Sequence, residues 1–534
     1  MIPNKREVIR SPLIPLVRKP FAASIIISPL APTDILLAGL LGLGALLLYV
    51  RTLAPSLLWG DSAEFQTLSY TMGMTHPSGY MTHIMIGKLF TYIPVGNIAY
   101  RVNLMSACFA ALAVSQVYLI VRLLGRVSVA GISAALMLSL TPLFWRNALV
   151  AESYAPAAGM IALIWSLFLL WRRTQKWQYL FLAGLAGGLS IGIHSTVVMT
   201  AASVLVIMLI TARKQAEWVG ATAGALLGII ATFLFFLFLD GHNPPSSIYN
   251  TTYFPAYSME GVFTKDFDTP FKRFFAIFPA DHFWSYYFTA DATETSRRLV
   301  EYISLHPLWA VALILIGIFA LFTRDWHDAL YPVIAFLILW GFAITVSFSI
   351  YQEFYTPIAV FVFVWYGVGV DVVLDVLNSI LSSSKIRSQG VYLILSMAFI
   401  ILPLLQFHAD LVTGIRAGYT TFVQRDHLYP IFAPHKAILD ALKIVNSVED
   451  NAIVFTNWDK LYSYVYTAHI EQGRTGIAFH LALEDDIYLA ESTLAYIDEN
   501  IDQRPVYFAV YVPELTEYFK VEQINESLYK LYRK

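Results

Sequence analysis

Residues 35–65 read ILLAGLLGLGALLLYVRTLAPSLLWGDSAEF, an apolar run that leads into an acidic segment. A run of about 20 apolar residues is long enough to cross the hydrocarbon core of a bilayer as a helix. The whole chain has the same character, since 57% of its 534 residues are hydrophobic and only 13% are charged. A water-soluble protein of this length needs more charge to cover its surface. The sequence therefore predicts an α-helical polytopic membrane protein that is embedded in a lipid bilayer.

The rest of the composition excludes several classes of function. A net charge of −2 supplies no basic face for nucleic acid, so no nucleic-acid partner is expected. The single cysteine, Cys108, cannot form an intramolecular disulfide. The sequence contains no Walker motif, dinucleotide-binding glycine fingerprint, CxxC pair or HExxH motif, so chemistry with a soluble nucleotide cofactor is not supported.

About eleven segments are long and apolar enough to be membrane spans. Lys and Arg residues lie in alternate loops between them, and such loops are typical of the cytoplasmic side of a membrane. This orientation places residues 54–99 and the long loop 240–304 on the outward face. The predicted spans are 34–53, 100–121, 128–145, 154–171, 178–194, 196–212, 218–239, 305–322, 330–350, 354–376 and 391–408.

Three regions follow from this count. Residues 1–33 are expected to form a cytosolic arm, and 34–408 the transmembrane domain, in which 54–99 would be the catalytic loop. The acidic tail, 409–534, is expected to form a small outward-facing soluble α/β domain, because it is long enough to bury its own core. Its β-branched and aromatic runs predict strands, and its apolar spacing predicts helices. The strands are expected at 452–455 and 506–512, and the helices at 434–448 and 484–499.

The acidic segment after the first span has two compatible interpretations. A fixed carboxylate such as Asp61 or Glu64 can act as a general base. The same Asp-x-x-Glu spacing is also common at helix starts, where Asp61 would be the N-cap of a capping box. Phe65, Leu68 and Met72 share one helical face, which predicts a helix that lies in the membrane interface.

Other polar residues stand at the outward ends of predicted spans. Arg146 and Glu152 flank a short loop, and they are either interfacial anchors or functional groups at membrane depth. His194, between two apolar runs, is either a structural hydrogen-bonding residue or part of a site. Glu353 and Tyr355 lie at another outward rim, where aromatic residues also form the ordinary interfacial belt.

The charged residues of the long loop and of the acidic segment suggest two further kinds of ligand, lipid phosphate groups and a divalent cation. Arg297 and Arg298 make the long loop locally basic and could pair with a lipid phosphate or with headgroups. A pair of carboxylates could hold a divalent cation such as Mg or Mn, but the sequence alone specifies no metal.

Three motifs together resemble a family of protein O-mannosyltransferase-like membrane proteins that was first described as a domain of unknown function. They are WGDSAEF at 59–65, THPSGY at 75–80 and AYRVNL at 99–104. The family pattern is a GDSGE-like segment, an HPPGYPL-like turn and a YRVNLLSA-like helix start. Ala63, Ser78 and Met81 depart from it, whereas both acids, the histidine and the arginine are kept.

Weaker similarity extends from about residue 35 to 515. AESYA at 151–155 is similar to the family's AEVYAL segment, and the glycine-rich run 187–194 also ends in a histidine. AIVFTNWD at 452–459 is similar to an ILFTNGDND-like stretch, but Trp458 stands where the family often has glycine. RPVYFA at 504–509 is similar to the family's RPIYFA-like strand.

The family is similar to the GT-C superfamily of glycosyltransferases, and the resemblance implies a GT-C-like fold. It also implies that Asp61 is the catalytic base, with Glu64 or Glu152 as its helper. Arg101, Arg146 and His194 would face the donor phosphate, where charge develops as the lipid leaves. With the outward-rim residues, the expected substrate-binding set is His76, Tyr80, Arg101, Asn103, Arg146, His194, Glu353 and Tyr355.

The implied reaction is the inverting transfer of a monosaccharide, expected to be mannose, from a polyprenyl-phosphate carrier to Ser or Thr hydroxyls of a translocated protein. Two other classes of function stay open: a transporter or flippase of a lipid-linked or small polar substrate, and a scaffold whose tail binds partners. No internal repeat is found, which favours the enzyme over the transporter. The expected location is a bacterial cell membrane, with the site on the extracytoplasmic side; a secretory-pathway membrane stays open.

Overall fold

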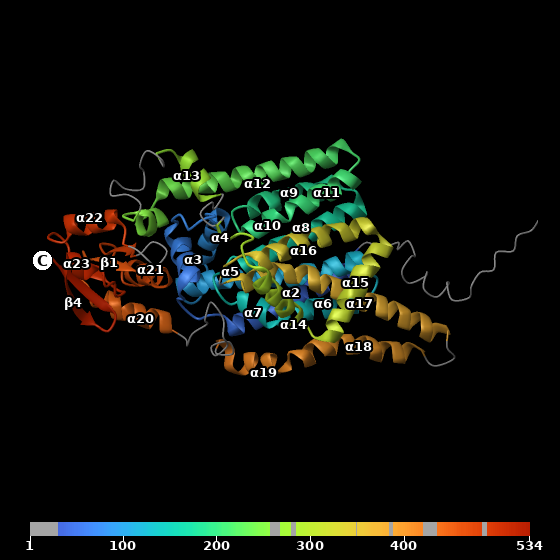
Figure 1. Ribbon diagram of the computed structural model, residues 1–534. Coiled ribbons are helices and arrows are strands. Elements are labelled where there is room, and N and C mark those ends of the chain that lie inside the picture. The colour runs from blue at the N-terminus through green and yellow to red at the C-terminus, as the bar shows by residue number, and fades with distance from the viewer. Residues whose placement is uncertain are drawn as a thin grey trace, which may run out of the picture.

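A bundle of apolar helices makes up most of the molecule, and a small β-sheet lies at one end of the bundle (Figure 1). The computed structural model describes residues 30–256, 268–278, 285–348, 350–383, 388–419, 435–482 and 489–534. The expected N-terminal arm falls outside this part of the chain except for its last four residues, 30–33.

Seven described helices are long and apolar enough to cross a membrane, or eight if one bent pair counts as a single span. The bent pair consists of α14 and α15, which meet at 97°. These lengths support an integral, multi-pass membrane protein. The bundle contains α2 (Pro32–Thr52), α5 (Ile98–Leu124), α6 (Ser128–Leu140), α8 (Tyr154–Thr174), α9 (Trp177–Ser190), α10 (Ser195–Met199), α11 (Ala201–Thr211), α12 (Gln215–His242), α14 (Ala292–Ser304), α15 (Leu308–Arg324), α16 (Trp326–Thr345), α17 (Tyr355–Ser383) and α18 (Ser388–Gln406).

Each of the eleven predicted spans coincides with a helix or with two successive helices, but some of these are shorter than a span needs. The segment 128–145 breaks after α6 because Pro142 disfavours helical backbone at Thr141, which is extended. A second short helix, α7 (Pro142–Asn147), follows the break. The span count of eleven therefore stays a prediction.

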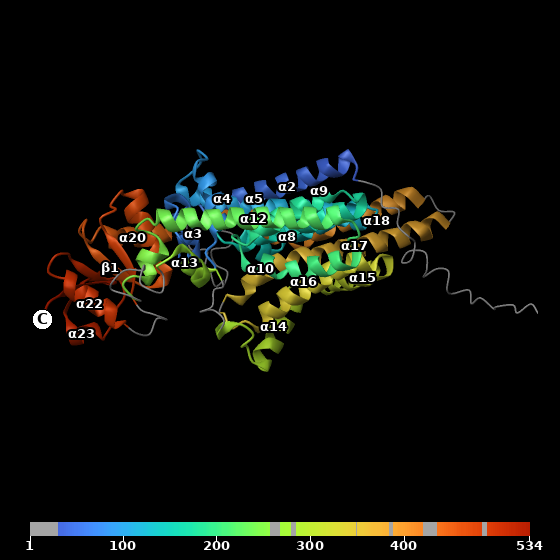
Figure 2. The same cartoon turned by 90° about the horizontal axis from the view of Figure 1, so that it is seen from above.

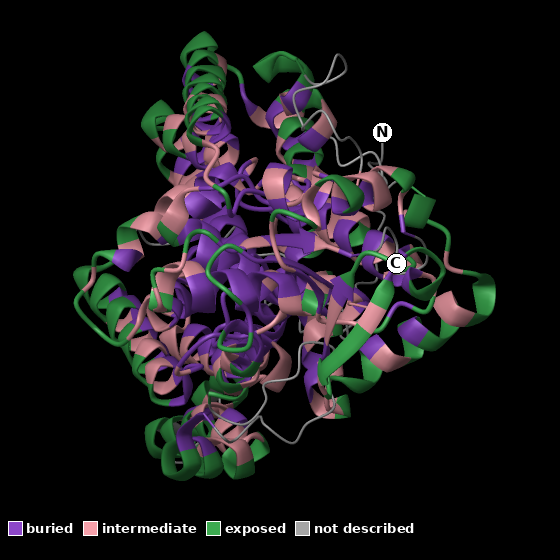
Figure 3. Ribbon diagram, turned by 90° about the vertical axis from the view of Figure 1, so that its left-hand side faces the viewer, coloured by how far each residue is buried: buried purple, intermediate pink, exposed green. Residues whose placement is uncertain are grey.

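Close packing of small residues holds part of the bundle together. α9 and α12 approach through Gly184 and Gly188 on one helix and Gly224 and Gly228 on the other. A Cβ atom added at Gly224 would lie 2.0 Å from the carbonyl oxygen of Phe181, so the close approach of the backbones requires glycine there. α17 is the central helix, since 94% of its apolar window is buried, and the exposed residues gather on the outer helices (Figure 3).

The C-terminal region forms the predicted α/β unit. Its sheet has the strand order β2-β1-β3-β5-β4, in which β1 is parallel to both β2 and β3, and β5 is antiparallel to both β3 and β4. β3 lies within the predicted segment 506–512, and β1 overlaps the predicted segment 452–455 but ends one residue later. The strands are β1 (Ile453–Thr456), β2 (Ala478–Leu481), β3 (Val506–Phe508), β4 (Lys520–Asn525) and β5 (Leu528–Tyr532), and the helices are α20 (Lys436–Val445), α21 (Trp458–Val465), η5 (Tyr466–Glu471), α22 (Glu491–Asn500) and α23 (Leu515–Tyr518).

Helices of the loop that follows the first span lie between the bundle and the sheet. α3 (Gly60–Thr71) and α4 (Met81–Thr91) adjoin the C-terminal unit in both views (Figures 1 and 2). The predicted helix is present, and nearly every residue from Gly60 to Ser69 is buried within the protein. Its position in the membrane interface stays a prediction. The remaining short helices are η1 (Tyr249–Tyr253), α13 (Pro270–Ile277), η3 (Tyr351–Phe354) and α19 (His408–Ala417).

Candidate active site

The acidic segment enters α3 through a sharp turn. Gly60 has a φ of 59°, a left-handed conformation that a residue with a side chain rarely adopts. The N-cap of the helix is Trp59, which makes no side-chain capping bond, and Asp61 is the second helical residue. The predicted capping box is therefore wrong, because Asp61 is already inside the helix and its carboxylate bonds elsewhere.

Glu64 holds His76 in place with both of its carboxylate oxygens. Oε1 of Glu64 accepts the backbone N–H of His76 at 2.8 Å, and Oε2 lies 2.5 Å from Nδ1 of the ring. The Glu64 side chain is completely buried. The two residues are 12 positions apart, so the turn 72–80 brings the histidine back over α3.

Asp61 and Glu152 complete the group. Oδ2 of Asp61 lies 4.0 Å from Nε2 of His76, and the Asp61 side chain keeps 19% of its surface exposed. Glu152, in the short loop before α8, accepts a hydrogen bond from the Ser62 hydroxyl at 2.6 Å. Asp61, Glu64, His76 and Glu152 are called the acid–histidine cluster below.

Burial and mutual charge set the protonation of this cluster. Burial raises the pKa of Glu64, although the His76 ring opposes the rise. Burial also raises the pKa of Glu152 well above its usual range, and the nearby Asp61 carboxylate adds to the effect. Burial alone would disfavour a charged His76, but the Glu64 and Asp61 carboxylates outweigh it and raise the pKa of His76 to about 9. His76 is therefore a cation at neutral pH.

This shift predicts how stability depends on pH. The folded protein holds the His76 proton more tightly than the unfolded chain does, because the pKa rises from 6.5 to about 9 on folding. The resulting stabilisation is full below about pH 6.5 and is lost as the pH rises through about 9. Thermal unfolding midpoints of the purified protein should therefore fall across this range, and those of His76→Gln should fall less. Equal slopes for the two proteins would contradict the assignment.

Aromatic rings close one side of the cluster. Tyr80, the residue before α4, has its ring centroid 5.0 Å from those of both His76 and Phe65. The His194 ring lies 6.1 Å from Tyr80 and 5.0 Å from Tyr154. Nδ1 of His194 also caps α10, because it accepts the backbone N–H of Thr196 at 3.2 Å. Tyr80 and His194, both predicted from the sequence, thus lie beside the acids.

Arg146 and Glu353 lie next to this group but bind each other. Their side chains form a buried ion pair, and the Asn147 amide donates to the second Glu353 oxygen at 2.6 Å. The Glu353 charge is close enough to influence Glu152. Arg146 is therefore already neutralised, whereas the sequence led us to expect it to face a donor phosphate.

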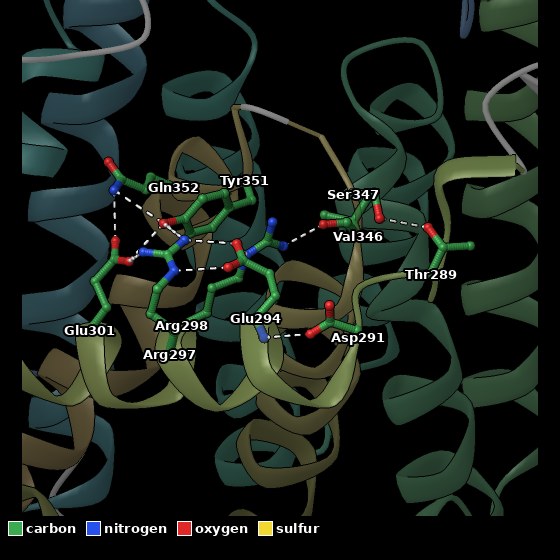
Figure 4. A network of polar contacts seen from close by, with 10 residues as sticks. All are labelled: Thr289, Asp291, Glu294, Arg297, Arg298, Glu301, Val346, Ser347, Tyr351 and Gln352. Atoms are coloured by element: carbon green, nitrogen blue, oxygen red, sulfur yellow. Dashed lines mark hydrogen bonds and ion pairs between the residues drawn. The ribbon is translucent and has the colours of Figure 1, made fainter.

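Tyr355 belongs to a different network, on the far side of η3. Its ring packs 4.7 Å from that of Tyr302 and 6.0 Å from that of Tyr351. Figure 4 shows the polar contacts that connect α14 with the segment 346–352. Arg298 binds Glu294 at 2.7 Å and lies 3.8 Å above the Tyr351 ring. Arg297 and Arg298, which the sequence suggested could pair with a lipid phosphate or with headgroups, form ion pairs within the protein.

Two predicted binding residues, Arg101 and Asn103, form hydrogen bonds with backbone carbonyl groups and not with the cluster. Arg101 donates to the carbonyl oxygens of Thr91, Val95 and Gly96 at 2.8, 2.8 and 3.1 Å, and so closes the loop after α4. Asn103 donates to the Ala54 carbonyl at 3.0 Å and accepts from Gln66 at 2.8 Å. Both positions fix the outward loops, because they satisfy groups that would otherwise be buried without partners.

Sequence reasoning missed three neighbours of the acids. Ser62 bonds Glu152, and Trp458 donates its indole N–H to Oδ1 of Asp61 at 2.8 Å. His83 is buried against Phe65, with ring centroids 4.5 Å apart, and within the described chain its ring nitrogens have no hydrogen-bond partner. The only signal for Trp458 was its departure from the family's glycine, and nothing in the sequence singled out His83.

A metal site is not formed by the described residues. Among them, no group of three or more His, Cys, Asp or Glu side chains has an arrangement that could hold a metal ion. The carboxylates of the cluster are engaged with His76, Ser62 and Trp458, so no step of the chemistry below is assigned to a metal.

Known proteins resemble this chain in part of its sequence and in its fold. Residues 61–218 match the family model described as "Protein O-mannosyl-transferase TMEM260 N-terminal domain". A mouse protein named protein O-mannosyl-transferase TMEM260 is 36% identical over 108 residues, which cover 20% of this chain and 15% of the relative. The Dictyostelium discoideum protein of the same name is 25% identical over 142 residues, 26% of this chain and 17% of the relative. The resemblance stated from the motifs is confirmed, although the matches span less than a fifth of these relatives.

Solved structures extend the likeness to the whole chain. ArnT from Cupriavidus metallidurans, solved with bound undecaprenyl phosphate, has a TM-score of 0.55 at 12% identity, covering 94% of this chain and 98% of that chain. The fold is GT-C-like. The oligosaccharyltransferase of Archaeoglobus fulgidus has a TM-score of 0.50 at 14% identity, covering 89% of this chain and 68% of that chain. The predicted fold class, a GT-C-like helical membrane domain with a small C-terminal α/β domain, is thus confirmed.

Proposed function

We propose that this chain is a membrane glycosyltransferase that moves mannose from a polyprenyl-phosphate carrier to Ser or Thr hydroxyls of translocated proteins. The acid–histidine cluster carries the proposal. It brings Asp61, Glu152 and a Glu64-bound His76 together in the outward loops, with Asp61 partly open to solvent. A partly exposed carboxylate in such a group can take a proton from an acceptor hydroxyl, and the cationic histidine beside it can lie near a phosphate. A purely structural ion pair needs neither property.

Asp61 is the acid best placed to act as the base. Glu64 is fully buried, and both of its oxygens are occupied by His76. Glu152 is also buried, and its raised pKa favours the protonated form, which is a poor base. Asp61 is the most exposed of the three carboxylates and lies at the start of a rigid helix.

The proposed reaction is a single displacement. The acceptor hydroxyl attacks the anomeric carbon of the sugar, and the bond from that carbon to the phosphate oxygen breaks. The hydroxyl proton passes to Asp61, and the lipid phosphate leaves with the electron pair of the broken bond. The cationic His76 ring is a source of positive charge in the cluster, and it would lower the cost of the negative charge that grows on the leaving phosphate.

The comparisons support the substrate classes without establishing them. The family model that matches residues 61–218 and two relatives that match part of the chain carry the name protein O-mannosyl-transferase, which supports mannose and a protein acceptor. ArnT, which shares the fold, was solved with undecaprenyl phosphate, which supports a lipid-phosphate donor. The distribution of Lys and Arg supports a site on the extracytoplasmic side of a cell membrane, as in a bacterium.

A transfer assay with the purified full-length protein tests the function. The protein receives polyprenyl-phosphate [³H]mannose and a Ser/Thr-rich peptide, and we expect the label to move to the peptide. A peptide with alanine at every Ser and Thr should stay unlabelled, and GDP-[³H]mannose should not replace the lipid donor. If no label moves from lipid-linked mannose, the proposal fails; movement of intact labelled lipid across a vesicle membrane without transfer would favour a flippase.

A further inference from the structure

The C-terminal domain reaches the acid that we assign as the base. Trp458, at the first position of α21, donates its indole N–H to Oδ1 of Asp61 at 2.8 Å, although the two residues are 397 positions apart. Its ring also stands edge-on to His76, with centroids 5.6 Å apart and planes at 87°. One side chain thus contacts two members of the acid–histidine cluster.

Other contacts fix this domain against α3 and the loops around it. The Lys460 ammonium lies 3.8 Å above the ring of Trp59, the residue before α3. The Thr67 hydroxyl of α3 donates to the Tyr462 carbonyl at 3.2 Å. The Tyr466 hydroxyl accepts the backbone N–H of Ala99 at 3.1 Å. Several interactions therefore hold α21 in register with the acidic helix, so that the position of Trp458 relative to Asp61 is defined.

The chemistry of indole suits the task of orienting a base. The indole N–H donates a hydrogen bond but has no acceptor atom, and it does not ionise at ordinary pH. It can therefore fix one oxygen of Asp61 without competing for the proton that the carboxylate must take. The other oxygen, Oδ2, is the one that faces Nε2 of His76.

We propose that Trp458 is a positioning residue for Asp61, and that docking of the C-terminal domain completes the active site. This inference rests on the proposed function, because it gives Trp458 a role only if Asp61 acts as the base. The domain is then part of the catalytic unit rather than a separate binding module. A positioned carboxylate loses efficiency when it can rotate away from the acceptor.

Trp458→Phe tests the role, because it removes the N–H donor and keeps an aromatic ring. A hydrogen bond to a charged group is worth about 1.5–3 kcal/mol, which corresponds to a loss of roughly 10- to 100-fold in kcat. The KM for the lipid donor should stay within about twofold, since the interaction acts on the base and not on donor binding. Tyr507→Phe is the matched control: it removes one hydroxyl that donates to Glu449 inside the C-terminal domain, away from Asp61 and from the contacts with α3, and it should keep wild-type kcat.

Thermal unfolding checks that the variants are folded, and Trp458→Tyr replaces Trp458→Phe if the latter is not. Wild-type kcat in the Trp458 variant would overturn the inference. So would a rise in KM with kcat unchanged, or an equal loss of kcat in Tyr507→Phe. If Asp61→Asn is inactive while Trp458→Phe is fully active, only this inference fails. If Asp61→Asn is itself active, the proposed base fails and the role of Trp458 fails with it.

Discussion

Replacement of Asp61 by asparagine is expected to lower the rate of sugar transfer by about 10³-fold. A positioned general base contributes roughly 10²–10⁴-fold, and an amide cannot accept the proton of the acceptor hydroxyl. The amide keeps the size of the carboxylate, and its oxygen can still accept the N–H of Trp458, so the fold should not change. The measurement is the rate of [³H]mannose transfer from the lipid donor to the peptide under single-turnover conditions.

Asp459→Asn is the matched control, since it makes the same chemical change at an exposed acid that follows Trp458 directly. It should transfer sugar at close to the wild-type rate. Wild-type activity in Asp61→Asn would remove Asp61 from the mechanism. Glu152 would then be the next acid to examine, because it shares the cluster through Ser62.

Arg146→Met is expected to destabilise the protein by about 3–5 kcal/mol, because it leaves the buried Glu353 carboxylate without its cation. Both side chains are almost completely buried, and their partners lie within the bundle. The measurement is the free energy of unfolding in detergent. The exposed Arg533, paired with Asp498 and Asp502, offers a control, and Arg533→Met should leave the free energy of unfolding close to that of the wild type.

The double variant Arg146→Met/Glu353→Gln separates a structural pair from a substrate-binding one. Removal of both charges should restore most of the lost stability, because no buried charge is then unpaired. If Arg146→Met is as stable as wild type but raises the KM for the lipid donor, the arginine serves the donor phosphate and not Glu353. That result would contradict the geometry described here.

Hydropathy predicted the membrane domain well because its signal is local. Each predicted span coincides with helical structure, since a long apolar run can satisfy its backbone only as a helix within a bilayer. The break between α6 and α7 has a local cause that the sequence contains, because Pro142 ends the helix that begins at Ser128. The predicted span 128–145 ran across this proline. The strands 453–456 and 506–508 were also predictable, from their β-branched and aromatic residues.

Only part of the site could be predicted. Contacts between residues close together in the sequence were visible in the motifs, whereas contacts between distant residues were not. Glu64 and His76 are 12 residues apart in one loop, so their motifs pointed to the same place. The Arg146–Glu353 pair spans 207 residues, and the contact of Trp458 with Asp61 spans 397. Such partners depend on how helices and domains pack, and no local pattern records them. Arg101 is a different case: the resemblance implied a phosphate partner, but its hydrogen-bond partners are carbonyl oxygens of its own loop, 5 to 10 residues away.

The anomeric configuration of the product tests the central claim most directly. If Asp61 deprotonates the acceptor for a single displacement, the mannosyl residue on the peptide must have the configuration opposite to that in the lipid donor. Nuclear magnetic resonance of the product peptide, made from a donor of known configuration, measures this. We predict inversion in every product molecule, whereas retention would require a covalent sugar–enzyme intermediate and would contradict the role assigned to Asp61.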